Sequence, residues 1–152
     1  MADVVFNRFK ANIADGTIDW DTTTGIRVLL LSTAVATPDP DLDFVADLVD
    51  GSNNIELSTT NYGRQDVASR TVAIDDTNNR SVLDAADNVW TALGPASGGP
   101  TVRGALVYLR VGADDSTPAD DPLIAYFDLV DTQVNSGNFT VQWAAAGLIT
   151  LT

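Results

Sequence analysis

An alternation of apolar and polar side chains with a period of two, clearest in residues 138–152, most constrains the fold. Phe139, Val141 and Trp143 fall on one side of an extended chain, with polar residues between them. This is the pattern of a strand with one buried face. A second run, 148–152, is apolar on both faces. We expect it to form either a central strand or a contact with a neighbouring subunit.

Similar short segments recur along the chain and are separated by polar turns. The segments expected as strands are 18–20, 26–32, 67–74, 80–83, 88–93, 103–111 and 122–129. Eight or nine short strands with Asp-, Gly- and Pro-rich turns favour a sandwich or a barrel. The predicted fold class is therefore mainly β: a single-domain antiparallel β-sandwich or barrel with a short N-terminal helix or arm.

Residues 3–14 are predicted to form that helix, because Val5, Phe6, Phe9 and Ile13 recur along one stripe. Asp3 is a candidate N-cap and Gly16 a candidate stop. A helix this short is marginal in water and must dock on something. We therefore divide the chain into a helix or docking arm, 1–16, and a β domain, 17–152.

The charge of this arm differs from that of the remainder. Residues 1–13 carry one Asp against Arg8 and Lys10, a net charge of +1, whereas residues 14–152 carry twenty acidic residues against six basic ones. Two interpretations stay open: the helix packs on its own sheet, or it docks on an acidic or apolar partner. The long connection 33–54, with helical turns expected at 41–49, is a second candidate for function.

Composition excludes several kinds of chemistry. The 152 residues contain no Cys and no His, so disulfides, thiolate zinc sites and Ser–His or Cys–His nucleophiles are excluded. The net charge of −13 disfavours binding to nucleic acid or to an anionic membrane. We find no signal peptide and no apolar run near the ~20 residues that span a bilayer. We expect a soluble protein made in the cytoplasm, with no membrane or nucleic-acid partner.

Clusters of Asp are the candidate metal sites. They lie at residues 39–43, at Asp75 and Asp76, and at Asp114, Asp115, Asp120 and Asp121. The first cluster lacks the glycine and the final glutamate of a calcium loop. We interpret all of these clusters as solvated turns, predict no cofactor and no metal, and do not expect an enzyme.

The tryptophans are candidates for packing or for contact. Trp90 and Trp143 lie in alternating strands and are expected to anchor the core. Trp20 lies between two Asp residues, and we expect it to be exposed and available to a partner.

Four stretches carry a resemblance to a family: residues 6–12 (Phe-Asn-Arg-Phe-Lys-Ala-Asn), 85–91 (Ala-Ala-Asp-Asn-Val-Trp-Thr), 105–108 (Ala-Leu-Val-Tyr) and the ending 139–151. The chain resembles a family of small acidic structural proteins of tailed bacteriophages. The resemblance implies a virion component made in the host cytoplasm, a capsid decoration (cement) protein on the capsid exterior. It also implies a homotrimer that binds the major capsid protein, with no active site.

The expected partner-binding residues combine the arm, the exposed tryptophan and the apolar ending: Phe6, Arg8, Phe9, Lys10, Trp20, Leu148, Ile149 and Leu151. Two alternatives remain. A tail or head-fibre module would bind a host receptor or glycan through exposed aromatic residues around a cleft. A glycan-cleaving enzyme would need two carboxylates in one pocket, one of them with a raised pKa.

Overall fold

The computed structural model describes residues 3–33, 35, 38–49 and 55–152. The protein is mainly β, with antiparallel sheets and one short helix near its N-terminus, as the sequence predicted. The elements are β1 (Val4–Val5), α1 (Asn7–Ala14), β2 (Ile26–Leu31), the 3₁₀ helix η1 (Val45–Asp47), β3 (Gln65–Asp66), β4 (Thr71–Asp75), β5 (Arg80–Asp84), β6 (Asn88–Leu93), β7 (Thr101–Leu109), β8 (Leu123–Gln133), β9 (Gly137–Val141) and β10 (Ile149–Leu151).

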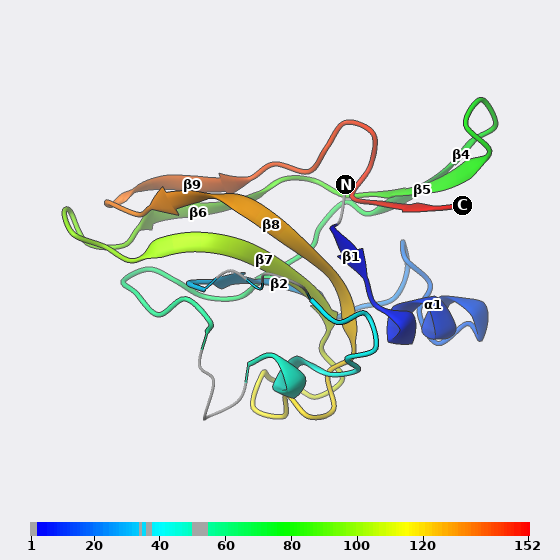
Figure 1. The fold of residues 1–152 in the computed structure, drawn as a ribbon, viewed down its shortest axis with the longest axis horizontal. Coiled ribbons are helices and arrows are strands. Elements are labelled where there is room, and N and C mark those ends of the chain that lie inside the picture. Colours follow the sequence, from blue (N-terminus) through cyan, green and yellow to red (C-terminus); the bar gives the residue numbers. More distant parts are fainter. Residues whose placement is uncertain (1–2, 34, 36–37, 50–54) are drawn as a thin grey trace.

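One layer is a five-stranded sheet with the order β1-β8-β7-β2-β3 (Figure 1). Its central strands are apolar on both faces, which explains why β2 reads Ile-Arg-Val-Leu-Leu-Leu. Such a strand is stable only if both faces of its sheet are covered. A second layer of strands covers one face, and the long connection together with the start of the chain covers the other.

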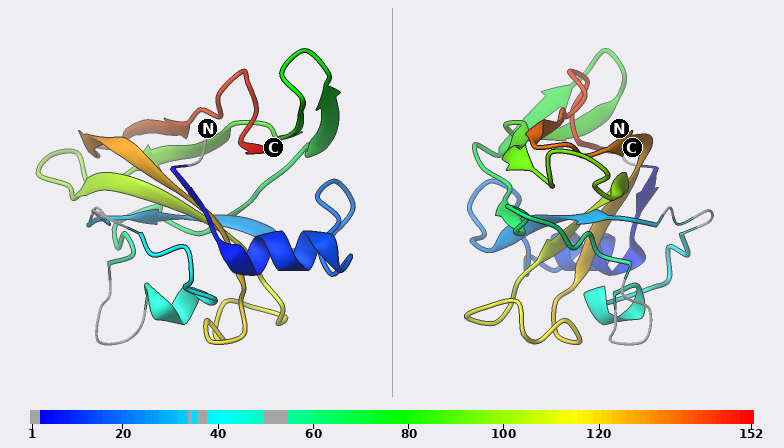
Figure 2. Two further views of the ribbon diagram at one scale, coloured as in Figure 1. Left: turned by 45° about the vertical axis from the view of Figure 1, so that its right-hand side comes forward. Right: turned by 90° about the vertical axis from the view of Figure 1, so that its left-hand side faces the viewer.

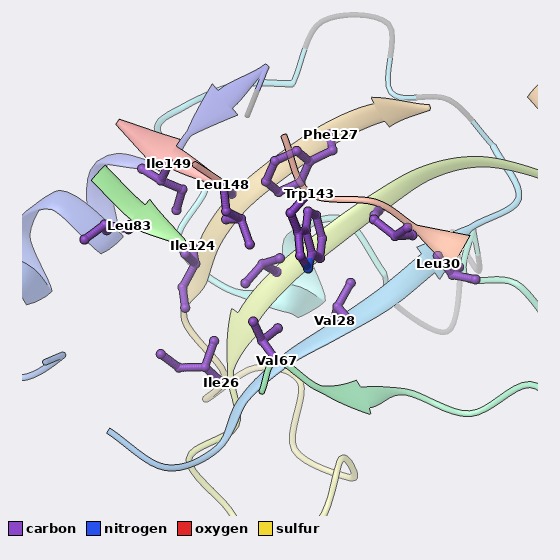
Figure 3. Packing of buried hydrophobic residues seen from close by; sticks show 14 of the residues in the cluster. Ile26, Val28, Leu30, Val67, Leu83, Ile124, Phe127, Trp143, Leu148 and Ile149 are labelled. Carbon is purple, nitrogen blue, oxygen red and sulfur yellow. The ribbon is translucent and has the colours of Figure 1, made fainter. Parts of the chain in front are cut away.

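The second layer covers one face of that sheet. It consists of the pair β6-β9, which lies along β7 and β8, and the three-stranded sheet β10-β5-β4 (Figure 1). The main core lies between the layers and contains Trp90 and Trp143, which are 2% and 6% exposed. Figure 3 shows Trp143 and Leu148 from the C-terminal segment directed toward Phe127 and Ile124 of β8. The two tryptophans are core anchors, as predicted.

The opposite face of the five-stranded sheet is covered by the long connection and by the start of the chain. Val45 and Val49 pack there with Phe6 and Tyr126. The expected helical turns at 41–49 are present as the short helix η1. The predicted end of the connection, residues 51–54, lies outside the described residues.

The start of the chain differs from the prediction. Val4 and Val5 pair with Tyr126 and Ala125 as strand β1, so α1 begins only at Asn7. Asp3 does not cap the helix, because its Oδ2 accepts the backbone N–H of Asp128 at 2.6 Å. The side-chain spacing of Val4 and Val5 also suits a helix. These residues form a strand because pairing with β8 satisfies their backbone hydrogen-bonding groups.

In the first half, one strand prediction is wrong and a second, at 67–74, is right only from residue 71 onward. Residues 18–20 form no strand: Asp19 and Trp20 belong to a turn closed by the Thr23 amide on the Asp19 carbonyl at 2.8 Å. The strand predicted at 67–74 is broken at Ser69, whose φ is +51°. This left-handed residue separates β3 from β4 and sends the two strands into different sheets.

The C-terminal run is neither a central strand nor a free surface. Strand β10 is the edge of the three-stranded sheet and pairs with β5, with Ile149 opposite Leu83. Gly147, with φ at +97°, makes the turn into it; a Cβ atom there would lie 2.2 Å from Val82 Cγ1. Leu148 and Ile149 are fully buried, so this segment completes the protein's own core.

Candidate functional site: an apolar groove beside the β4–β5 hairpin

One face of the three-stranded sheet runs from the core out into solvent. Its cross-strand rows are Val72, Leu83 and Ile149, and further out Ile74, Ser81 and Leu151. Leu83 and Ile149 are at most 2% exposed, whereas Val72 and Ile74 on β4 are 49% and 79% exposed. The apolar face is therefore longer than the domain's own core requires.

An apolar groove of about 450 Å³ opens under this face. One wall comes from the end of α1 and the turn after it, through Ile13, Ile18 and Trp20. The other wall comes from the sheet, through Val72, Leu83 and Leu151. Figure 2 shows the green β4–β5 hairpin projecting beyond the layers on the same side as the blue helix.

Trp20 connects the two walls. Its Nε1–H donates to the backbone carbonyl of Asp84 at 3.0 Å, and its ring meets Phe9 edge to face at 6.2 Å between centroids. Arg70 donates from Nε to the Trp20 carbonyl at 2.6 Å and from Nη2 to the Thr23 carbonyl at 2.5 Å. These bonds satisfy buried polar groups, so the groove is a preformed feature of the fold.

One carboxylate, that of Asp19, lines the groove. Asp15, Asp19 and Asp21 lie on the stretch from α1 to the Trp20 turn, which carries no basic residue between them. Asp19 and Asp21 share a side-chain hydrogen bond, which lowers the pKa of Asp19 and raises the pKa of Asp21.

A second polar cluster lies beside β2, β3 and β7. Arg64 binds both oxygens of Glu56, at 2.9 and 2.8 Å, and Tyr62 donates its hydroxyl to Glu56 at 2.7 Å. Burial, followed by the nearby Glu56 charge, raises the pKa of Tyr62. Tyr108 and Arg27 both donate to Asp115. Because these groups partner one another, we interpret the cluster as a brace between strands rather than as a binding site.

The Asp residues at 39–43 and at 75–76 behave as turns. The expectation of a solvated turn is wrong for two residues of the third cluster, because Asp121 is fully buried and Asp115 is paired with Arg27. The Asp39 carboxylate accepts the Asp41 amide at 3.0 Å, and a hydrogen bond from Asn78, followed by one from Arg80, lowers the pKa of Asp75. Within the ranges that the structure describes, no group of three or more His, Cys, Asp or Glu side chains is placed to hold a metal ion.

The predicted partner-binding residues divide into two groups. The structure buries Phe6, Phe9, Trp20, Leu148 and Ile149 at 1% exposure or less. The expectation that Trp20 is exposed was wrong, because its ring fills the space between α1 and β5. Of these five residues, only Trp20 lines the groove.

The remaining predicted residues keep some surface. Arg8 stacks over the Phe44 ring at 4.7 Å, and Lys10 is exposed and donates to Asn7. Leu151 lines the groove. Whether they meet a partner stays a prediction.

Sequence reasoning missed Val72 and Ile74. Both belong to a segment interpreted as an ordinary half-buried strand, whereas the β4–β5 hairpin extends beyond the core. The acidic turn after Ile74 indicates the tip of a hairpin but does not show how far that hairpin projects.

No protein-family model, no curated protein and no solved structure matches the chain. Among the helices of the described residues, none is long and apolar enough to cross a membrane.

Proposed function

We propose that this protein is a non-enzymatic structural component of a tailed-phage virion, a decoration protein that binds the outer surface of the head. The observation that carries the proposal is the apolar face of β10-β5-β4, which continues past the core to Val72 and Ile74. Apolar side chains gathered at a groove are typical of a surface that another protein covers. The sequence resemblance supplies the class of partner, the major capsid protein.

The acidic composition supports a place on the exterior of a particle. A net charge of −13 repels packaged nucleic acid and keeps a protein of high copy number soluble. Many weak contacts suffice when the copies act together on one particle. The homotrimer and the capsid-exterior location are part of this proposal.

The glycan-binding alternative is less well supported, because the tryptophan rings it requires at the surface are buried. It required exposed aromatic rings around a cleft, yet the three tryptophans are 1%, 2% and 6% exposed. The groove is lined mainly by aliphatic side chains, which suits a protein segment better than a sugar.

Binding to undecorated heads tests the proposal. Purified protein is mixed with heads, the bound fraction is measured by sedimentation, and the resistance of the heads to heat is recorded. We expect binding and a gain in resistance. Ile74→Asp should lower the affinity at least about tenfold. Val130→Asp is the matched control, because Val130 is 88% exposed on β8. Wild-type protein that leaves the heads unbound and unprotected would refute the proposal.

A further inference from the structure

The free edge of β4 is the most unusual part of the surface. In the order β10-β5-β4, strand β4 is terminal, and no other strand of the described residues pairs with its second edge. Thr71, Val72, Ala73 and Ile74 are all exposed. Strand edges usually carry Lys, Pro or a bulge that prevents further pairing. Residues 71–75 contain no Lys and no Pro and pair with β5 in unbroken register.

This edge lies directly beside the groove. Val72 belongs to β4 and also lines the groove wall. A strand added along β4 would place alternate side chains on the same face as Val72 and Ile74, because side chains alternate across a sheet. Those side chains would enter the groove mouth opposite Ile13 and Trp20. Backbone bonds to the edge and apolar contacts in the groove would therefore act together.

The charges around the groove indicate the chemistry of the occupant. Asp19 lines the groove. Asp75 and Asp84 lie on the face of the sheet opposite Val72 and Ile74, the face to which the side chains that alternate with the groove-facing ones would point. The basic groups nearby are already partnered: Arg80 binds Asp75 at 2.8 Å and Arg70 binds backbone carbonyls. A second copy of this acidic chain would add like charge. The complementary occupant is an extended segment whose apolar residues alternate with Lys or Arg.

We propose that β4 accepts such a basic, alternating segment of a partner protein by strand addition, with its apolar side chains in the groove. This rests on the proposed function, because it describes how the same surface engages its partner. Strand addition is a general mode of peptide recognition in which main-chain bonds supply affinity and alternate side chains supply specificity.

A synthetic peptide that alternates valine and lysine is the direct probe. Hydrogen exchange of the full-length protein is measured with and without millimolar peptide, together with the dissociation constant. We expect slower exchange at amides within Thr71–Asp75 and loss of binding in Ile74→Asp but not in Val130→Asp. Asp84→Asn, on the sheet face to which the lysines would point, should weaken binding by roughly two- to fivefold. A peptide alternating valine and glutamate should not bind.

Four results would overturn this inference: no protection of β4 by the lysine peptide, protection elsewhere only, equal binding of the glutamate peptide, or self-association abolished by Ile74→Asp. Head binding by the same variants separates the two proposals. If Ile74→Asp impairs head binding while the peptide leaves β4 unprotected, strand addition is wrong and the proposed function stands. If wild-type protein does not bind undecorated heads but binds the peptide along β4, the proposed function is wrong.

Discussion

Trp20 Nε1 donates a 3.0 Å hydrogen bond to the backbone carbonyl of Asp84, across a separation of 64 residues. This bond joins the turn after α1 to strand β5 and so joins the two walls of the groove. Trp20 is only 1% exposed and lines the groove, so its ring belongs both to the core and to the groove wall.

Trp20→Phe removes this donor and leaves the Asp84 carbonyl without its partner. We expect a loss of about 1–3 kcal/mol in the free energy of unfolding, measured by urea denaturation. Trp90→Phe is the matched control, because it loses a comparable bond to the Gly63 carbonyl at 2.7 Å. Both variants should lose stability, and only Trp20→Phe should also weaken peptide binding. Equal peptide binding by the two variants would contradict this role for Trp20.

Glu56→Leu removes the carboxylate that binds the Arg64 guanidinium at two positions and leaves that guanidinium, whose side chain is 12% exposed, with only the longer ion pair to Asp115 at 3.6 Å. We expect a loss of about 3 kcal/mol, because a buried charge that loses its main partner is costly. Adding Arg64→Met should restore much of that loss, since the poorly paired charge is then gone. Asp131→Asn is the surface control: it breaks the exposed pair with Arg103 and should cost at most about 1 kcal/mol. A double variant as unstable as the sum of its single variants would show that the strand brace depends on the ions themselves.

Asp121 gives the protein a specific pH dependence. Its side chain is fully buried and accepts the Val111 amide at 2.9 Å, and burial raises its pKa. The folded state therefore binds this proton more tightly than the unfolded state, whose pKa is near 3.9. The contribution of Asp121 to stability rises as the pH falls through its raised pKa toward that value.

Asp121→Asn removes this effect. Between neutral pH and about pH 4, wild type should gain stability relative to the Asn variant, as measured by paired urea titrations at each pH. Asp76→Asn, at an exposed position in the β4–β5 turn, should show no such difference. A constant gap between wild type and Asp121→Asn across this range would disprove the prediction.

Deletion of residues 148–152 removes β10 and two fully buried side chains, Leu148 and Ile149. Each buried aliphatic side chain that is lost costs about 2–5 kcal/mol, so we expect the shortened protein to be unfolded by circular dichroism. Deletion of the exposed Thr152 alone should leave the fold intact. A folded five-residue deletion that fails only to assemble would instead make β10 an intersubunit contact.

Local sequence patterns correctly predicted the strands that pair along the same residues that show the pattern. Strand β6 occupies the predicted residues 88–93, and β5 differs from its prediction by one residue. The errors occur where pairing with residues far away in the sequence determines the local structure. Val4 and Val5 suit a helix by spacing, but the open edge of β8 pairs with them. Ser69 adopts a left-handed backbone conformation, which could not be predicted from the residue type.

The candidate site was predictable only in part. Trp20 and Leu151 were singled out as contact residues, and both line the groove. Their side chains were placed on a free surface, whereas Trp20 is a buried wall. The exposure of Val72 and Ile74 could not be read from the chain, because it depends on how far the hairpin projects beyond the opposite layer (Figure 2).

The five-stranded sheet also sets the order in which the chain can fold during synthesis. Strand β2 has buried residues on both faces, yet its main partner β7 follows only at residues 101–109. At about 5–20 residues per second, the ribosome exposes an apolar strand for seconds before its neighbour emerges. Non-local pairing of this kind makes folding slow and prone to aggregation. The dense negative charge of the intervening turns then acts as a solubilising factor on the nascent chain.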